Sequence, residues 1–287
     1  MNDCRIVRAT EKTDFLMALA FVLPHEKTCC SLTRKILDRE DGVHLVMRGD
    51  KTNGVFFFLE DDIFLPCLSG IRSGGLKALA SFLAGKKLFC ISALEDELSK
   101  IRPLLPRLNK PPRLHESRRY SFLEYQDREA ARTAIDSLPG AFRIKMAEAG
   151  DEAALLPLHL SYIREEVLLK GRKLNEKFER EQLKDTLASQ VVALAVTGSE
   201  GQARIAAKAG TNAIASGVMQ LGGVYTVQEE RGKGLAAALT AFLAESAAQK
   251  GMATVLFVNK NNLPAAAAYR KAGFRDSGKD YTIEYYD

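Results

Sequence analysis

Apolar and polar positions alternate along this chain in short runs that are typical of strands and helices in about equal number. Residues 142–146 and 281–285 alternate with the period of two that marks a strand with one buried face. Residues 234–249 are rich in Ala and Leu, and Gly251 follows where such a helix would end. The pattern therefore predicts an α/β protein with mixed sheets flanked by helices.

The second half gives the clearer order of elements. Asp151 is the expected cap of a helix that runs to about residue 169, and a strand, helix, strand sequence surrounds residue 231. Such a sequence predicts a right-handed crossover between parallel strands. The further expected elements are a helix at 178–187, strands at 191–196, 203–214, 217–227 and 254–258, and a helix that begins at 262.

The first half repeats this order in a weaker form. A hairpin with an acidic turn is expected at residues 54–66, between an earlier pair of strands and a later strand and helix pattern. At 287 residues the chain is long enough for two cores. We therefore expect two domains, residues 1–138 and 139–287, joined by a polar helical connector near 127–140. The expected first-half elements are strands at 4–8, 43–47, 88–92 and 120–124 and helices at 76–84 and 95–105.

A candidate anion site lies between the strand at 217–227 and the helix that follows it. Arg231 is followed by two glycines, Gly232 and Gly234, and by a small alanine in the first helical turn. The first N–H groups of a helix lack intrahelical acceptors and attract anions, and small residues let a phosphate approach them.

A second segment follows the strand at 254–258. Asn262 and Pro264 mark a helix start, Tyr269 lies seven residues after the Asn, and Gly273 marks the helix end. The two segments together resemble the GNAT superfamily of N-acetyltransferases, whose pyrophosphate loop has the pattern Arg-x-x-Gly-x-Ala and whose next segment carries Asn, Ala, Tyr and Gly-Phe.

The resemblance implies the GNAT fold for the second half, in which two parallel strands separate to receive the pantetheine of acetyl-CoA. It implies acetyl-CoA as a co-substrate and backbone contacts from the strand before the loop. The cofactor-binding residues that it implies are Val224, Thr226, Arg231, Gly232, Lys233, Gly234, Leu235, Ala236 and Asn262.

Acyl transfer to an amine also needs proton carriers. Tyr269 has a phenol that can protonate a departing thiolate at neutral pH, and we assign it as the general acid; the alternative is that it only packs in the core. Asn262 could contact pantetheine, cap its helix, or do both.

The general base is less clearly marked. Many GNAT enzymes carry a glutamate on the strand before the loop, but Gln220 stands in that stretch and cannot accept a proton. Glu165 and Glu166, near the end of the first helix of this half, are the nearest carboxylates by family layout; the alternative is that one is a solvated helix charge. Tyr225 is a further candidate.

The first half resembles a degenerate second GNAT copy. Its equivalent loop begins Arg72-Ser73-Gly74 but places Lys77 where a small residue is expected, and the following helix has no Tyr. We expect a non-catalytic domain that shapes the substrate site or forms a contact in a homodimer.

Composition narrows the function classes. The net charge of +5 is spread evenly over the chain, which argues against a nucleic-acid partner. No run approaches a membrane span and no basic-then-apolar segment opens the sequence, so we expect a cytoplasmic protein. The five cysteines and four histidines have no metal-ligand spacing, and no metal is expected.

Three functions are consistent with these observations. The first is an N-acetyltransferase that transfers acetyl from acetyl-CoA to a primary amine of a small molecule or protein. The second is an acyl-CoA-binding regulatory or sensor module without turnover, which the missing strand glutamate favours. The third is a nicotinamide enzyme using Gly232-x-Gly234, but this dinucleotide fingerprint lacks the direct strand junction and the later carboxylate that it requires.

Overall fold

The computed structural model describes residues 4–198 and 203–287. Contacts divide the chain into two compact units. The first contains the residues up to Phe122 together with Gly278–Asp287, and the second contains Leu123–Ser277. The C-terminal segment therefore packs with the first unit, and residues 123–138 pack with the second. The division at 138/139 stays a prediction about where independently folding domains meet.

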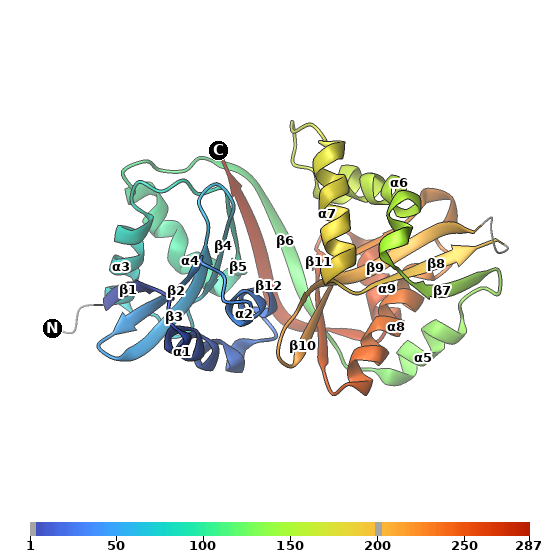
Figure 1. Cartoon of the computed structure of the whole chain (residues 1–287), viewed down its shortest axis with the longest axis horizontal. Helices are drawn as coiled ribbons and strands as arrows, with labels where there is room; N and C mark the ends of the chain where they lie inside the picture. Colours follow the sequence, from blue (N-terminus) through green and yellow to red (C-terminus); the bar gives the residue numbers. More distant parts are fainter. Residues whose placement is uncertain (1–3, 199–202) are drawn as a thin grey trace. The chain divides into compact units, whose positions relative to one another are not determined.

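The first unit is a mixed sheet with helices on both faces (Figure 1). Its strand order is β1-β2-β3-β4-β5-β12, and only the β4–β5 pair is parallel among the pairs within it. Its elements are β1 (Cys4–Arg8), α1 (Lys12–Val22), α2 (Cys30–Leu37), β2 (Val43–Arg48), β3 (Lys51–Phe58), β4 (Ile63–Cys67), α3 (Ser73–Leu83), β5 (Cys90–Leu94), α4 (Glu95–Ile101), most of β6 (Leu114–Tyr125) and the end of β12 (Phe274–Tyr286).

Strand β3 shows why this sheet has two apolar faces. Val55 and Phe57 pack in the cluster with α1 and α2, whereas Phe56 and Phe58 pack with α3 and α4. Successive side chains of a strand point to opposite faces, so the continuous apolar run fills both cores.

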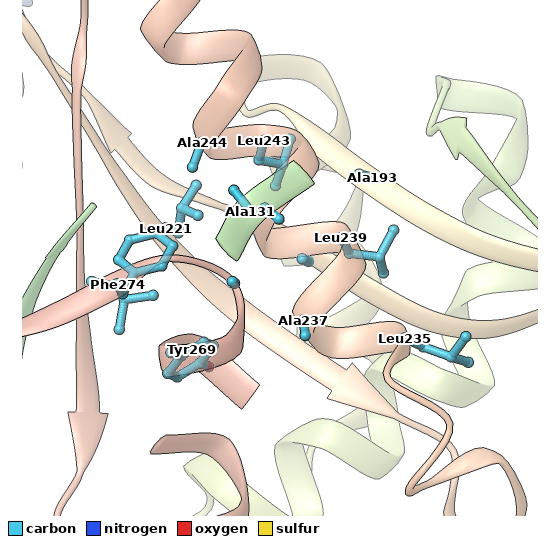
Figure 2. Packing of buried hydrophobic residues seen from close by; sticks show 14 of the residues in the cluster. Ala131, Ala193, Leu221, Leu235, Ala237, Leu239, Leu243, Ala244, Tyr269 and Phe274 are labelled. Carbon is cyan, nitrogen blue, oxygen red and sulfur yellow. The ribbon is translucent and has the colours of Figure 1, made fainter. Parts of the chain in front are cut away.

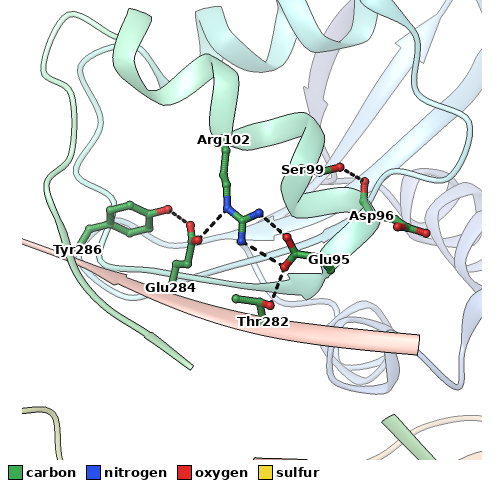
Figure 3. A network of polar contacts seen from close by, with 7 residues as sticks. All are labelled: Glu95, Asp96, Ser99, Arg102, Thr282, Glu284 and Tyr286. Carbon is green, nitrogen blue, oxygen red and sulfur yellow. Dashed lines mark hydrogen bonds and ion pairs between the residues drawn. The ribbon is translucent and has the colours of Figure 1, made fainter. Parts of the chain in front are cut away.

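The C-terminal strand is fixed in the first unit by register and by charge. Tyr281 to Tyr285 pair antiparallel with Leu94 to Cys90. The Arg102 guanidinium binds Glu95 of α4 and, over 2.8 Å, the buried Glu284 of β12, as Figure 3 shows. A buried carboxylate costs much less when it is paired, so this ion pair ties β12 to α4.

The second unit is also a mixed sheet between helices. Its strand order is β11-β10-β9-β8-β7, with the end of β6 beside β11, and β10–β11 is a parallel pair. Its elements are α5 (Arg128–Asp136), β7 (Phe142–Met146), α6 (Glu152–Tyr162), the π-helical segment η4 (Ile163–Val167), α7 (Glu176–Ser189), β8 (Val192–Thr197), β9 (Arg204–Ile214), β10 (Val218–Thr226), α8 (Leu235–Gln249), β11 (Ala253–Asn259), α9 (Leu263–Lys271) and the start of β12.

Two apolar clusters cover the faces of this sheet. One is built on α8, with α5 and α9 beside it, and contains Leu239, Phe274 and Tyr269 (Figure 2). The other lies under α6 and α7 and contains Leu155, Leu183 and Tyr225. Helix α8 can lie close to the sheet because half of its buried positions are alanines.

The predicted mixed sheets are present, and most element bounds agree to within a few residues. Two local expectations were wrong. Asp151 is not a side-chain cap of α6, because it accepts the N–H of Glu148 over 2.8 Å, in a capping box around the preceding turn. The final strand begins at Phe274 rather than Tyr281.

Candidate active site

Strands β10 and β11 pair over only part of their length. Their parallel register runs from Val218↔Ala253 to Leu221↔Leu256, although β10 continues to Thr226 and β11 to Asn259. The N–H of Val227 donates to Ala206 O on β9 over 2.9 Å. Because successive backbone groups of a strand alternate in direction, those of Thr226 face the β11 side. The strand end therefore directs the N–H of Thr226 to the side where an extended amide chain would lie, while Thr226 O accepts from Arg231 Nε over 3.1 Å.

An irregular stretch of β10 begins where this pairing ends. The register with β9 shifts between Gly222 and Tyr225, and Gly223 has φ +60°. A side chain at Gly222 would collide with that of Asn212 on β9. Such bulges re-aim side chains beside active sites, and here the next residue to resume the register is Tyr225.

The loop after β10 has the backbone expected of a phosphate loop. Gly232 and Gly234 have φ of +82° and +81°, which L side chains rarely adopt, and a Cβ at either would meet open space. The first helical hydrogen bond of α8 runs from Ala238 N to Gly234 O at 3.0 Å. The helix itself therefore supplies no acceptor to the N–H groups of Leu235 and Ala236, and no side chain caps it.

The two cations of this loop point in different directions. Arg231 lies with its guanidinium 5.4 Å from the Tyr225 ring centroid and donates from Nε to Thr226 O over 3.1 Å. Lys233 binds Glu230 over 2.5 Å and lies over the Phe142 ring. Arg231 is thus directed to the strand end and Lys233 away from it, toward the turn before the loop.

Glu165, on the π-helical segment η4, joins the strand to the loop. It accepts hydrogen bonds from the Tyr225 hydroxyl over 2.5 Å and from Arg231 Nη2 over 2.6 Å. These two bonds, the tyrosine's first, lower the pKa of Glu165, so the carboxylate is ionised at neutral pH. Burial, and then the Glu165 charge, raise the pKa of Tyr225.

Glu166 reaches the second predicted segment. Asn262 Nδ2 donates to both carboxylate oxygens of Glu166, over 3.3 and 3.4 Å. Its Oδ1 accepts the N–H of Ala265 over 3.0 Å, which confirms that Asn262 caps α9. Glu165 thus contacts the loop that begins at Arg231, and Glu166 contacts Asn262. The segment η4 therefore touches both sequence motifs. π-helical turns are often found at functional sites.

Tyr269 lies in the last turns of α9 and is buried against Phe274, with ring centroids 6.4 Å apart (Figure 2). Within the part of the chain that the structure describes, its hydroxyl has no hydrogen-bond partner. Burial raises the pKa of Tyr269, and Tyr162 and Glu166 raise it further. The phenol keeps its proton at neutral pH, as a general acid must, while its ring serves as core.

Several residues beside this site were missed by sequence reasoning. Lys208 is buried on β9 directly opposite Tyr225, and Tyr162 lies against Tyr225 with ring centroids 6.2 Å apart. A lysine within the small apolar run Ala206-Ala207-Lys208-Ala209 was a usable signal, because lysines are rarely buried without a reason. Gln220, already identified from the sequence, is buried on β10, and its amide cannot act as a base.

The corresponding region of the first unit has protein side chains beside two of its backbone segments. Strands β4 and β5 pair only at Ile63↔Cys90 and Phe64↔Ile91. Glu97 of α4 is buried and accepts the N–H of Leu68, the residue after β4, over 2.5 Å. At the start of α3, a Cβ on Gly74 would lie 3.3 Å from Cys4 Sγ. The carboxyl group of Glu97 thus takes the N–H that follows β4, and Cys4 of β1 lies beside the start of α3.

The remaining chemistry is limited. No group of three or more His, Cys, Asp and Glu side chains in residues 4–198 and 203–287 is placed to hold a metal ion.

None of the helices that the structure describes is both long and apolar enough to cross a membrane.

The chain is similar to one protein family in sequence and to several solved structures in fold. Residues 201–283 match the family described as FR47-like protein. No protein with a curated description matches the sequence significantly.

Solved structures match over nearly the whole chain. A Drosophila protein has a TM-score of 0.68 at 13% identity, covering 99% of both chains. A tandem GNAT protein from the clavulanic acid biosynthesis pathway has a TM-score of 0.62 at 11% identity, covering 98% of both. A GNAT-family acetyltransferase from Colwellia psychrerythraea has a TM-score of 0.56 at 12% identity, covering 98% of this chain and 99% of that one.

The predicted fold class is confirmed, since both halves take part in these full-length matches and one match is itself a tandem protein. This chain has the fold of these tandem GNAT proteins, and its residues 201–283 match the FR47-like family.

Proposed function

We propose that the protein is an acyl-CoA-dependent N-acetyltransferase, with acetyl-CoA as the donor and a primary amine of a small molecule or a protein as the acceptor. The second unit carries the activity. The acceptor reaches the carboxylates of η4, and the protein acts in the cytoplasm without a metal.

The observation that carries the proposal is the position of Glu165. One carboxylate contacts both Tyr225, at the strand end where pairing with β11 has ceased, and Arg231, at the start of the phosphate loop. A diphosphate at the loop offers Arg231 a stronger partner, since guanidinium binds phosphate oxygens in a bidentate manner. Glu165 would then be released toward an ammonium while Tyr225 keeps it in place.

The transfer needs little more than these groups. The ammonium gives a proton to Glu165 directly or through water, and its nitrogen attacks the thioester carbon, so that a C–N bond forms and the C–S bond breaks. Tyr269 protonates the leaving thiolate. Of the two protons that the ammonium loses in becoming an amide, one ends on the CoA thiol, by way of Tyr269, and one goes to solvent.

The cofactor would lie along residues of one strand, one loop and one cap. Val224 and Thr226 would bond the pantetheine arm through their backbone groups, and Asn262 would turn its amide from Glu166 to the cofactor. The loop from Arg231 to Ala236 would hold the diphosphate on its N–H groups, with Lys233 adding charge nearby.

The first unit, in this proposal, does not bind acyl-CoA. Glu97 occupies the backbone group after β4, and Cys4 lies beside the start of α3. Its roles would be to shape the acceptor site or to provide a contact in a homodimer.

A second candidate function is an acyl-CoA sensor without turnover. The buried Gln220 on β10 favours it, because the strand supplies no base and Glu165 is largely committed to its two partners. Both candidates require acyl-CoA binding and differ only in acyl transfer.

Release of free thiol from acetyl-CoA, measured with a panel of primary amines, separates the two. A transferase gives amine-dependent thiol release that Tyr269→Phe lowers strongly. A sensor binds acetyl-CoA, seen as a raised melting temperature, but releases no thiol beyond hydrolysis. Absence of any melting shift with acetyl-CoA, CoA or longer acyl-CoA would exclude both.

A further inference from the structure

Lys208 is a buried cation that the proposed reaction does not use. It lies in the middle of β9 with 6% of its surface exposed, and its register partner on β10 is Tyr225. Register partners in an antiparallel pair point to the same face of the sheet, so Lys208 lies on the face that carries α6 and η4.

Two side chains contact its ammonium, and a third lies behind one of them. Nζ lies 3.0 Å from His159 Nδ1, to which it donates, and 4.6 Å from the centroid of the Tyr162 ring. His159 Nε2 is buried and has no hydrogen bond to any residue that the structure describes, and Glu179 of α7 lies 3.5 Å from it. Lys208 is therefore held by a neutral imidazole and an aromatic face rather than by a direct carboxylate.

The contacts continue from Lys208 to the candidate base. The Tyr162 ring packs edge-on against the Tyr225 ring, and the Tyr225 hydroxyl donates to Glu165. A cation over an aromatic face fixes the ring that it contacts. The order Lys208, Tyr162, Tyr225, Glu165 is a continuous series of contacts from the core to the site.

We propose that Lys208 is a positioning residue whose ammonium, held by His159, fixes Tyr162 against Tyr225 and thereby fixes the Tyr225 hydroxyl on Glu165. The proposal concerns the same site as the proposed function, and its kinetic part rests on that function. In this proposal Lys208 sets the orientation of Glu165, the carboxylate that meets the acceptor amine.

The protonation of Lys208 makes the role measurable. Burial lowers the pKa of Lys208 to about 8, and burial together with the Lys208 charge lowers the pKa of His159 to about 4. The groups facing Lys208 are His159 and Tyr162 from α6, Glu179 from α7 and Tyr225 from β10. His159 is neutral well above pH 4, so the group that loses a proton near pH 8 is the ammonium of Lys208.

The first test does not depend on turnover. In protein with 13C-labelled tyrosine rings, the resonances of Tyr162 and Tyr225 should shift with a midpoint near pH 8 in the wild type and should not do so in Lys208→Met. Tyr162→Phe keeps the ring, so Tyr225 should still titrate; Tyr162→Leu should abolish the Tyr225 titration. An unchanged Tyr225 titration in Lys208→Met, or in Tyr162→Leu, would overturn the proposal.

The second test uses the enzyme. Lys208→Met should lower kcat by about tenfold near pH 7 and remove the fall in rate above pH 8, while the KM for acetyl-CoA stays within about twofold. Lys208→Arg should keep the neutral rate and carry it to higher pH, because guanidinium stays charged. If the rate of Lys208→Met depends on pH as the wild-type rate does, whatever its absolute value, Lys208 is only structural.

The outcomes of the two tests are separable. A wild-type protein that transfers no acetyl group removes the proposed function but leaves the tyrosine titration as a valid test of the contacts. If Lys208→Met does not fold, the comparison of Tyr162→Phe with Tyr162→Leu decides the matter, because neither variant alters the buried lysine.

Discussion

Arg231 and Glu165 form an ion pair over 2.6 Å between the start of the loop after β10 and the π-helical segment η4, which continues α6. Both side chains are nearly half exposed, at 46% and 43%, so the pair is weak in stability terms and easily exchanged. A diphosphate can therefore compete for Arg231, and an ammonium can then take its place at Glu165.

The first prediction concerns this exchange. Arg231→Met should weaken acetyl-CoA binding by about tenfold or more, since charge-assisted hydrogen bonds are worth about 1.5–3 kcal/mol. Glu165→Gln should leave acetyl-CoA binding unchanged or tighter, because Arg231 loses its competitor, and should lower turnover. Isothermal titration and thiol release measure the two quantities.

A matched control for this prediction is Arg164→Met. Arg164 is also exposed on η4 but binds Glu176 of α7 over 3.0 Å. Its loss should leave both acetyl-CoA affinity and turnover within about twofold. If Arg231→Met and Arg164→Met behave alike, Arg231 has no part in binding the cofactor.

The second prediction concerns the two ends of α8. Gly234 before the helix and Gly251 after it have φ of +81° and +72°, and a Cβ at either would meet open space. Substitution by Ala should therefore cost a similar free energy of unfolding, about 1 kcal/mol, at both positions. Only Gly234→Ala should also reduce the melting shift produced by acetyl-CoA, because only it displaces the loop amides.

If Gly234→Ala and Gly251→Ala reduce the melting-temperature shift with acetyl-CoA equally, the substitutions act only by destabilising helix α8. The melting temperature of each variant without ligand provides the reference for this comparison.

The third prediction separates chemistry from packing at Tyr269. Tyr269→Phe should lower kcat by about 100-fold, within the range for general acid catalysis, and should change the melting temperature little, because the hydroxyl has no partner among the described residues. Tyr281→Phe is the matched control: its buried hydroxyl bonds Ser92 over 2.9 Å, so its loss should cost about 1 kcal/mol of stability and no activity. Full activity in Tyr269→Phe would leave Tyr269 as a core residue alone.

Local signals allowed much of the second unit to be predicted. Gly232, Gly234 and Asn262 stand where a loop must take left-handed backbone or a helix must be capped, so their roles could be inferred from residue type. The site contacts of Glu165 could not. They depend on a π-helical turn that brings η4 to residues 60 and 66 positions later, and no short-range pattern encodes that turn.

The strand that pairs with the C-terminal strand β12 could not be predicted from the sequence either. Tyr281 to Tyr285 show a clear strand pattern, but pairing depends on a register with β5 almost 190 residues earlier. Alternation fixes which face of a strand is buried and says nothing about its neighbour. The place of Lys208 was hidden for a similar reason, because a single charge in an apolar run does not show which groups it faces.

The fourth prediction uses pH and the first unit. Burial raises the pKa of Glu97 to about 7 from an ordinary value of 4.5, so the folded state binds more protons than the unfolded state between these values. Stability is therefore lost as pH rises from about 4.5 to 7, by an amount on the order of 2–3 kcal/mol. Glu97→Gln, whose amide oxygen can still accept the Leu68 N–H, should be more stable than the wild type at pH 8 and similar at pH 4.5.

Urea unfolding of the two proteins at both pH values measures this difference. Asp50→Asn, which removes an exposed carboxylate that is not among the groups acting on Glu97, should show the wild-type pH dependence. A Glu97→Gln variant with the same pH dependence as the wild type would show that Glu97 is ionised when folded.

The stoichiometry of acetyl-CoA binding tests the account most directly. Isothermal titration of the full-length protein should show one site per chain, and Gly234→Glu should abolish it, because the loop after β10 holds the diphosphate while Glu97 and Cys4 close the counterpart in the first unit. No binding to the wild type, or one site that survives Gly234→Glu, would contradict it.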